Sequence, residues 1–209
     1  HVSGNYQFTD VAIGAIEWEA ALPWLRARRE RRGAQDEGRS PLDLMKPKRP
    51  LPPGFDPAAY RPYRMGDPTR LLSEGDVVRL GGFDLEALIA PAHTPGGVCL
   101  LDRRRRALFT GDTVLRGTIW LHLDGSAEPR MAVETYQKLA ALAAEVDHVL
   151  PAHGTTVLPG TFLTELAEGA EAIAQGRVAG RPMSTFAGDG TFYDLGGYGL
   201  LFARPVEVW

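Results

Sequence analysis

The chain has 209 residues, 44% of them hydrophobic and 23% charged, and this composition is typical of a compact globular domain rather than of a disordered chain. The formal net charge of −3 gives no bulk attraction to nucleic acid or to an anionic membrane, so we expect neither as a partner. The single cysteine, Cys99, excludes a disulfide within these residues and a cysteine-based zinc cluster, which leaves histidines and carboxylates as candidate metal ligands.

The first predicted elements are a short buried strand and the start of a helix. Residues 11–16 are almost all apolar and favour the strand, and residues 17–22 bring acidic side chains into the first helical turn. Residues 41–68 are rich in proline, which is unfavourable in helix and sheet interiors. We therefore expect one domain over residues 1–209, with a Pro-rich insertion or lid at about residues 33–70 that either sets specificity at a functional site or covers the sheet.

Two β-hairpins are predicted next. The first, over residues 77–89, turns at Gly81 and Gly82, a dipeptide suited to a tight hairpin. The second, over residues 98–110, turns at a run of four arginines. Because Cys99 lies among apolar neighbours in this second hairpin, we expect a buried thiol rather than a nucleophile.

The C-terminal half favours two amphipathic helices. The first begins at Pro129 and has apolar residues along one face as far as Val146. The second follows Pro159 and ends at Gly176, a residue type that commonly terminates helices. A short strand at residues 149–150 separates them, and strands are expected to close the glycine-rich C-terminal segment.

Three apolar runs end in a side chain of the metal-binding type. His93 lies in Pro-Ala-His-Thr-Pro-Gly-Gly, Asp112 ends Leu-Phe-Thr-Gly-Asp, and His153 lies in Leu-Pro-Ala-His-Gly. Several strand ends can converge on one edge of a sheet, where imidazole nitrogens and a carboxylate oxygen suit zinc or a similar divalent ion. The sequence therefore predicts a metal site built from His93, Asp112 and His153.

These motifs, in this order, resemble the metallo-β-lactamase-fold hydrolase superfamily over most of the chain. The resemblance implies an α/β fold, the αββα four-layer sandwich, here N-terminally incomplete. It makes His93 the third-motif histidine, Asp112 the catalytic carboxylate that bridges two metals, and His153 the last histidine. The opening His-Val-Ser-Gly-Asn resembles the end of the family's His-X-His-X-Asp-His motif, which makes His1 a metal ligand; copper chelation by an N-terminal histidine is the rival interpretation.

The sequence departs from the family pattern at several positions. Ala92 and Ala152 replace glycines that commonly precede the histidines, and Gly97 replaces a common histidine or serine. The first two histidines and the aspartate of the opening motif do not occur in this sequence. We therefore expect a fragment, a processed product or the ordered part of a longer chain, or else a second chain that supplies the missing ligands.

The resemblance implies a hydrolase with two divalent metal ions, for which zinc is expected and iron or manganese are the alternatives. A metal-bridging hydroxide would attack an acyl carbon, and oxyanion stabilisation would accelerate the reaction. The glyoxalase II and acyl-coenzyme A thioesterase branches resemble this sequence most, so we expect a thioester substrate. A lactonase or β-lactamase is the alternative enzyme, and a noncatalytic, metal-poor scaffold or heteromer subunit is the alternative of another class.

Some further side chains are candidates for substrate binding. His122 and Trp120 follow Asp112 at a place where loops of this family contact substrate, so both are candidates, with ordinary packing as the alternative. The run Arg103–Arg106 could bind a coenzyme A phosphate, but we expect a solvated turn. His148 is expected to face solvent.

The partners implied are a small-molecule acyl substrate and, as a homodimer, a second copy of the chain. Because no run approaches the roughly 18 apolar residues of a membrane span and no signal peptide opens the sequence, we expect a cytoplasmic protein.

Overall fold

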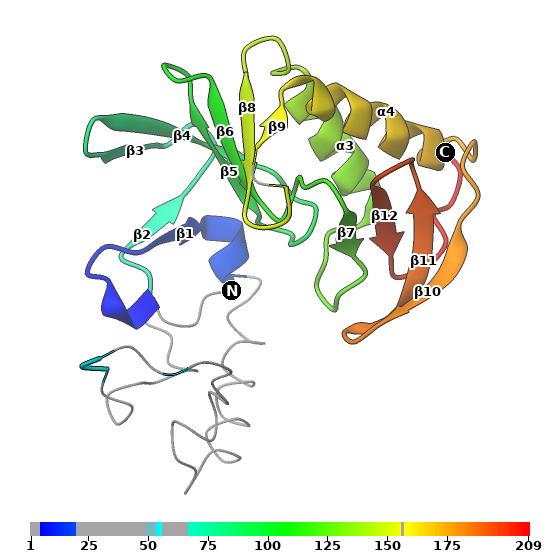
Figure 1. Ribbon diagram of the computed structural model, residues 1–209, viewed down its shortest axis with the longest axis horizontal. Coiled ribbons are helices and arrows are strands. Elements are labelled where there is room, and N and C mark those ends of the chain that lie inside the picture. The colour runs from blue at the N-terminus through cyan, green and yellow to red at the C-terminus, as the bar shows by residue number, and fades with distance from the viewer. Residues whose placement is uncertain (1–4, 20–49, 51–52, 56–66, 156) are drawn as a thin grey trace, which may run out of the picture. The chain divides into compact units, whose positions relative to one another are not determined.

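The computed structural model of the protein describes residues 5–19, 50, 53–55, 67–155 and 157–209 (Figure 1). The chain divides into two compact units, residues 1–13 with 18–71 and residues 14–17 with 72–209. The Pro-rich insertion predicted at about residues 33–70 lies mostly outside the described residues, so its role as a lid stays a prediction.

The N-terminal elements are shorter than the sequence predicts. A 3-10 turn, η1 (Asn5–Gln7), precedes β1 (Ala12–Gly14), which pairs with β2 (Arg70–Leu72) in a two-stranded sheet. The helix begins at residue 15, directly after β1, so the predicted strand over residues 11–16 is truncated. The turn before β1 is held by polar contacts, since the N–H of Val11 donates to Thr69 Oγ1 at 2.9 Å.

The larger unit contains a six-stranded sheet with the order β3-β4-β5-β6-β8-β9. Its strands are β3 (Val77–Leu80), β4 (Phe83–Ile89), β5 (Val98–Asp102), β6 (Ala107–Gly111), β8 (His148–Pro151) and β9 (Leu158–Pro159). Neighbouring strands are antiparallel except β6 and β8, which are parallel. Both predicted hairpins are confirmed, and Gly81 and Gly82 have positive φ angles of 56° and 88°, as a tight hairpin turn requires.

A four-stranded sheet has the order β10-β11-β12-β7. Its strands are β7 (Thr118–Leu121), β10 (Arg181–Thr185), β11 (Gly188–Asp194) and β12 (Gly199–Phe202). The closing strands were predicted, but β7 and β10 were not. β7 is only four residues long and pairs in parallel with β12, about 80 residues further along the chain, so its strand character depends on a distant partner.

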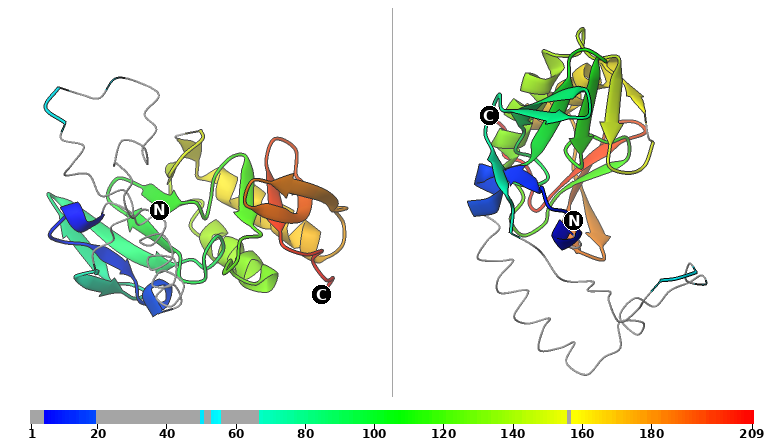
Figure 2. Two further views of the ribbon diagram at one scale, coloured as in Figure 1. Left: turned by 90° about the horizontal axis from the view of Figure 1, so that it is seen from below. Right: turned by 90° about the vertical axis from the view of Figure 1, so that its left-hand side faces the viewer.

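Two helices pack beside each other, α3 (Pro129–Ala140) and α4 (Thr161–Ala174), as Figures 1 and 2 show. Both predicted helices are confirmed, although the first ends at Ala140, before Val146. Gly176 follows α4 with a φ of 69°, the left-handed conformation that terminates helices. The N–H of Trp209 donates to the carbonyl of Ala174 at 3.1 Å, which holds the last residue of the chain at the end of α4.

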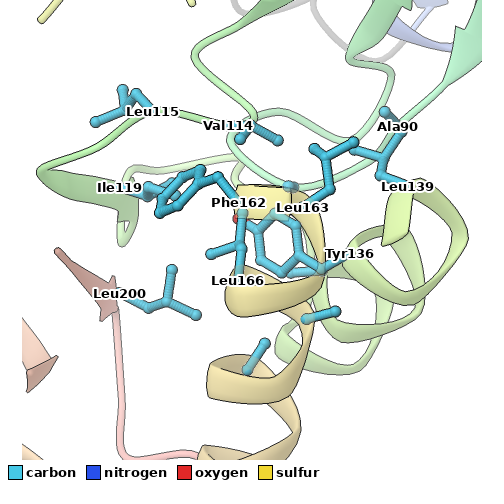
Figure 3. Close-up of a cluster of buried hydrophobic side chains, with 14 of the residues drawn as sticks. Ala90, Val114, Leu115, Ile119, Tyr136, Leu139, Phe162, Leu163, Leu166 and Leu200 are labelled. Atoms are coloured by element: carbon cyan, nitrogen blue, oxygen red, sulfur yellow. The ribbon is translucent and has the colours of Figure 1, made fainter. Parts of the chain in front are cut away.

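One hydrophobic cluster contains residues of the six-stranded sheet, the four-stranded sheet and helices α3 and α4 (Figure 3). Tyr136 of α3 and Phe162 and Leu166 of α4 are essentially inaccessible to solvent, and they pack in the same cluster as Ile119 of β7 and Leu200 of β12. Burial of this apolar surface is the main favourable contribution to folding. Its functional consequence is a fixed scaffold for the loops that follow β4, β6, β7 and β8.

Candidate functional site

Asp112 and His153 follow the two parallel strands of the six-stranded sheet. Asp112 comes directly after β6 and His153 comes two residues after β8, so both lie at the carboxyl ends of neighbouring strands. The N–H of Ala152 donates to the carbonyl of Gly111 at 3.0 Å, which extends the pairing just past the strand ends. Gly111 has a φ of 54°, and this left-handed conformation turns the chain sharply before Asp112.

His93 lies in the loop between β4 and β5. The N–H of Ala90 donates to the carbonyl of Gly97 at 2.7 Å, which closes the loop at its base. The N–H of Gly96 donates to Glu17 Oε2 at 3.0 Å, and a Cβ atom at Gly96 would overlap the backbone of Glu17. Glu17 therefore braces the loop that presents His93, and only glycine fits at position 96.

The structure brings three of the predicted ligands together. His93 Nε2 lies 3.8 Å from Asp112 Oδ2, and His153 Nε2 lies 3.1 Å from Asp112 Oδ1. The two imidazoles thus approach different oxygens of one carboxylate. Asp112 and His93 are largely buried, with 12% and 17% of their side chains exposed, whereas His153 is 61% exposed, so the site is accessible from the side of His153.

The other ring nitrogen of His93 has its own partner, since Nδ1 lies 2.7 Å from the backbone carbonyl oxygen of Trp120. A carbonyl only accepts hydrogen bonds, so Nδ1 carries a proton and donates it. In the neutral ring Nε2 then has a lone pair, and that nitrogen faces Asp112. A histidine whose second nitrogen is held by a carbonyl in this way is in the tautomer and orientation that suit a metal ligand.

The fourth predicted ligand is His1. His1 lies outside the described residues, so its assignment as a metal ligand stays a prediction. Within the described ranges no group of three or more His, Cys, Asp or Glu side chains is arranged closely enough to hold a metal ion. The donor types and the His93 tautomer fit a divalent metal, and the described part of the chain supplies only two imidazoles and one carboxylate toward it.

Trp120 and His122 lie beside this site. The carbonyl of Trp120 binds His93, and the Trp120 ring packs edge-on against the His122 ring with 5.3 Å between centroids. His122 is buried, and its Nε2 lies 3.0 Å from Thr185 Oγ1. Burial, and after it the Coulombic interaction with His93, lower the pKa of His122 below its ordinary value, which favours the neutral ring. Whether either side chain binds substrate stays a prediction.

Two residues of this region were not predicted from the sequence. Thr185 ends β10, and Phe186 lies at the tip of the hairpin between β10 and β11 with 95% of its surface exposed. The Phe186 ring packs edge-on against Trp120 with 5.1 Å between centroids. A hairpin is indicated by the glycine-rich run Phe-Ala-Gly-Asp-Gly after a short polar strand, and this pattern could have placed Phe186 at its tip. No local sequence pattern relates Phe186 to Trp120.

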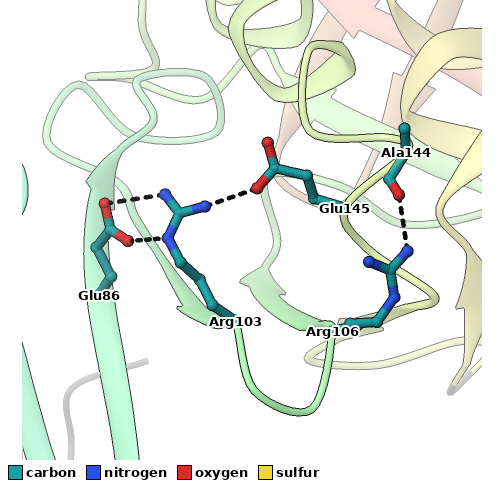
Figure 4. Close-up of polar contacts among 5 residues, drawn as sticks. All are labelled: Glu86, Arg103, Arg106, Ala144 and Glu145. Carbon is teal, nitrogen blue, oxygen red and sulfur yellow. Dashed lines mark hydrogen bonds and ion pairs between the residues drawn. The ribbon is translucent and has the colours of Figure 1, made fainter.

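The arginine-rich turn is occupied by ion pairs, as Figure 4 shows in part. Arg103 Nε and Nη1 donate to Glu86 and Glu145, each at 2.7 Å, and Arg106 Nε donates to Asp147 at 2.8 Å. Arg105 donates to Asp102 at 2.8 Å. These contacts support the expectation that the run is a structural turn rather than a phosphate site.

The predictions for two other residues are confirmed. Cys99 is a free, fully buried thiol in β5, and burial raises its pKa to about 12, so it is not a nucleophile at neutral pH. His148, the first residue of β8, is exposed to solvent. Among the described helices, none has the length and apolar character that crossing a lipid bilayer would require.

Comparison with known proteins places these features in a family. The model of the metallo-β-lactamase superfamily matches residues 1–162. The human acyl-coenzyme A thioesterase MBLAC2 is 32% identical over 160 residues, which are 75% of this chain and 53% of that protein. The atrochrysone carboxyl ACP thioesterase AgnL7 of Paecilomyces divaricatus is 36% identical over 102 residues, which are 47% of this chain and 30% of that protein.

The fold agrees with these relationships. The crystal structure of the metallo-β-lactamase family protein TTHA1429 from Thermus thermophilus matches with a TM-score of 0.56 at 16% identity, covering 83% of this chain and 57% of that one. The expected α/β sandwich of the metallo-β-lactamase type is therefore confirmed. This chain spans about half the length of the curated relatives it matches first, 53% of the human protein. Since the matched region contains His93, Asp112 and His153, in motif order and around one carboxylate, the chain belongs to the metallo-β-lactamase superfamily.

Proposed function

We propose that this chain carries the metal-binding side chains of a hydrolase that cleaves acyl thioesters. The observation that carries the proposal is the approach of His93 and His153 to opposite oxygens of the Asp112 carboxylate. The choice of a thioester is supported by the similarity to thioesterases, of which human MBLAC2 is 32% identical over 160 residues.

The metals we propose are two divalent ions, zinc in the first place and iron or manganese as alternatives. His93, Asp112 and His153 would hold them, together with His1, which lies outside the described residues. When bound, such ions would lower the pKa of water and polarise the substrate carbonyl, which would supply hydroxide and stabilise the oxyanion. The Asp112 carboxylate, which faces both imidazoles, would be the oxygen donor of the set.

The chain's own residues have defined tasks in this proposal. Asp112 is a largely buried carboxylate, and burying such a charge is unfavourable unless cations or donors compensate for it. His93 is fixed by its donation to the Trp120 carbonyl, so the lone pair on Nε2 cannot turn away from Asp112. His153 is the exposed ligand and marks the side from which a substrate can approach.

The test uses metal analysis together with a substrate panel. We expect the protein to bind divalent metal and to hydrolyse acyl-coenzyme A thioesters faster than esters, lactones or β-lactams. The variants Asp112→Asn and His153→Asn are expected to lose metal and to lower kcat/KM by about 100-fold or more. The matched control is His148→Asn, because His148 is the exposed first residue of β8, the strand that leads to His153.

Each outcome is decisive. Faster hydrolysis of lactones or β-lactams would contradict the thioester assignment and leave the metal centre in place. A folded protein that binds no metal and hydrolyses nothing would contradict the enzyme and favour a noncatalytic scaffold. Equal losses in His148→Asn and His153→Asn would show that the effect is structural rather than due to the site.

A further inference from the structure

The hairpin between β10 and β11 reaches the candidate site from the far end of the sequence. The sheet order places β10 and β7 at opposite edges of the four-stranded sheet, yet Thr185, the last residue of β10, contacts His122, the first residue after β7. Figure 1 shows the tip of this hairpin beneath β7 and its following loop. The curled sheet thus carries Phe186 to Trp120, with 5.1 Å between ring centroids.

The donor and the acceptor in the contact between His122 and the hairpin can be assigned. The Thr185 hydroxyl donates its one proton to the Gly188 carbonyl at 2.9 Å and accepts from the N–H of Ala187 at 3.1 Å. Since that proton is used, the His122 Nε2–H must be the donor in the 3.0 Å contact with Thr185 Oγ1. We call this contact the His122–Thr185 hydrogen bond.

This assignment leaves His122 Nδ1 as a bare acceptor. Nδ1 is buried and has no hydrogen-bond partner among the described residues, which is unfavourable for folding. Gly190 of β11 packs closely here, because a Cβ atom there would lie 2.5 Å from the Phe202 carbonyl oxygen and 3.2 Å from His122 Cβ. The contact that the buried ring does make, through Nε2 to Thr185, ties the residue after β7 to the hairpin between β10 and β11.

The exposed ring at the tip is also unusual for a purely structural residue. Phe186 is 95% exposed, so it contributes little to the core, while Trp120 is half-buried and its carbonyl binds His93 at 2.7 Å. We call Trp120 and Phe186 the aromatic pair. The aromatic pair therefore extends from the residue that contacts His93 to a solvent-exposed apolar ring. An apolar ligand that covered this ring would be favoured by the removal of apolar surface from solvent.

We propose that the aromatic pair receives the acyl chain of the thioester, and that the His122–Thr185 hydrogen bond positions Phe186 for this contact. The inference rests on the proposed function for the identity of the substrate. The occupant is an aliphatic chain, because the aromatic pair offers it apolar ring surface. The backbone carbonyl of Trp120 contacts His93, so a chain on these rings would lie next to the metal-ligand residues. Phe186 is then a specificity residue, and His122 and Thr185 are positioning residues.

The test measures binding without hydrolysis. Isothermal titration compares the hexadecyl and ethyl thioethers of coenzyme A, which present long and short chains but cannot be cleaved. The Phe186→Ala variant is expected to weaken binding of the hexadecyl compound about tenfold and that of the ethyl compound less than about twofold. The control is Leu80→Ala, because Leu80 is an apolar residue that is 65% exposed at the tip of a different hairpin, the one between β3 and β4.

A second pair of variants tests positioning. Thr185→Val removes the hydroxyl that accepts a hydrogen bond from His122. We expect this variant to raise KM for long-chain thioesters about threefold, with kcat and the KM for short-chain thioesters unchanged. Thr185→Ser keeps the hydroxyl and is expected to have the wild-type KM. The hexadecyl thioether of N-acetylcysteamine, which lacks the nucleotide, should show the same loss in Phe186→Ala. A loss confined to the coenzyme A compounds would overturn the assignment to the acyl chain.

The two proposals fail separately. Equal effects of Phe186→Ala on both chain lengths, or a change in oligomeric state in place of a change in binding, would overturn the role of the aromatic pair. The protein could instead hydrolyse no thioester and still bind long chains more tightly than short ones, with this preference lost in Phe186→Ala. That result would support the aromatic pair as an acyl-binding surface and contradict the proposed function.

Discussion

The N–H of Ala152 donates to the carbonyl oxygen of Gly111 at 3.0 Å, and this single backbone contact aligns the chain just beyond two parallel strands. The residue after Gly111 is Asp112 and the residue after Ala152 is His153, so the alignment of the backbone brings the two side chains to 3.1 Å of each other. The parallel pairing of β6 and β8 is therefore what creates the site, because it places both carboxyl ends at the same edge of the sheet.

Replacement of Gly96 should displace the loop that carries His93. In Gly96→Ala the added Cβ would overlap the Glu17 backbone, so we expect a loss of about 1–3 kcal/mol in stability and weaker metal binding. Thermal unfolding and metal titration measure the two effects. The control is Gly75→Ala, which has open space around its Cβ and a φ of 81°, and should lose stability by backbone strain alone, with metal binding unchanged. Normal metal affinity in Gly96→Ala would contradict the bracing role of Glu17.

The thiol of Cys99 should be inert in the folded protein. Burial raises its pKa to about 12, so the thiolate is scarce at neutral pH and the sulfur is also inaccessible. Native protein is expected to resist alkylation by iodoacetamide, and urea-unfolded protein to react fully. Because the thiol ionises in the unfolded chain first, its contribution to stability should decline as the pH rises from the ordinary pKa of 9.0 toward about 12. Rapid alkylation of the native protein would show that β5 opens readily.

The ion pair between Asp102 and Arg105 should stabilise the second hairpin in a pH-dependent way. The hydrogen bond from Arg105 lowers the pKa of Asp102 below its ordinary 3.8, although burial acts in the opposite direction. This stabilisation is present above pH 3.8 and is lost as the pH falls through the lowered pKa. Urea unfolding should therefore show a larger difference between wild type and Asp102→Asn at about pH 7 than at about pH 3.

A comparison variant strengthens that measurement. Asp147 pairs with Arg106 on the surface, with 55% of its side chain exposed, whereas the Asp102 side chain is 2% exposed. Asp147→Asn should consequently have the smaller effect at neutral pH, because solvent screens an exposed pair. An Asp102→Asn variant whose stability deficit is the same at both pH values would rule out the ionised carboxylate as the stabilising group.

Two phenylalanines should separate stability from binding. Phe162 of α4 is fully buried in the hydrophobic cluster (Figure 3) and packs edge-on against Tyr198. Its replacement by alanine is expected to cost about 3–5 kcal/mol of stability, because it leaves a cavity. Phe186→Ala is expected to change stability by less than about 0.5 kcal/mol, since 95% of that residue is exposed. Chemical denaturation measures both. A large destabilisation by Phe186→Ala would mean that the hairpin tip is a structural element.

Local patterns were sufficient for most of the regular structure. Both central hairpins, both helices and the stop at Gly176 followed from hydrophobic period, proline and glycine, since these act over a few residues. The strand β7 escaped prediction because four residues carry little periodicity and its partner, β12, lies far along the chain. The end of α3 at Ala140 was misplaced because Val146 is buried by tertiary packing, outside the helix.

By itself the sequence indicated the family and singled out His93, Asp112 and His153 as candidate metal ligands, because each lies in a local motif at the end of an apolar run. Only the tertiary structure decided which oxygen each imidazole approaches, that the Trp120 carbonyl fixes the His93 tautomer, and that Phe186 lies against Trp120. The physical reason is that strand pairing and sheet curvature set the distances between segments remote in sequence, and a local pattern contains no information about those distances.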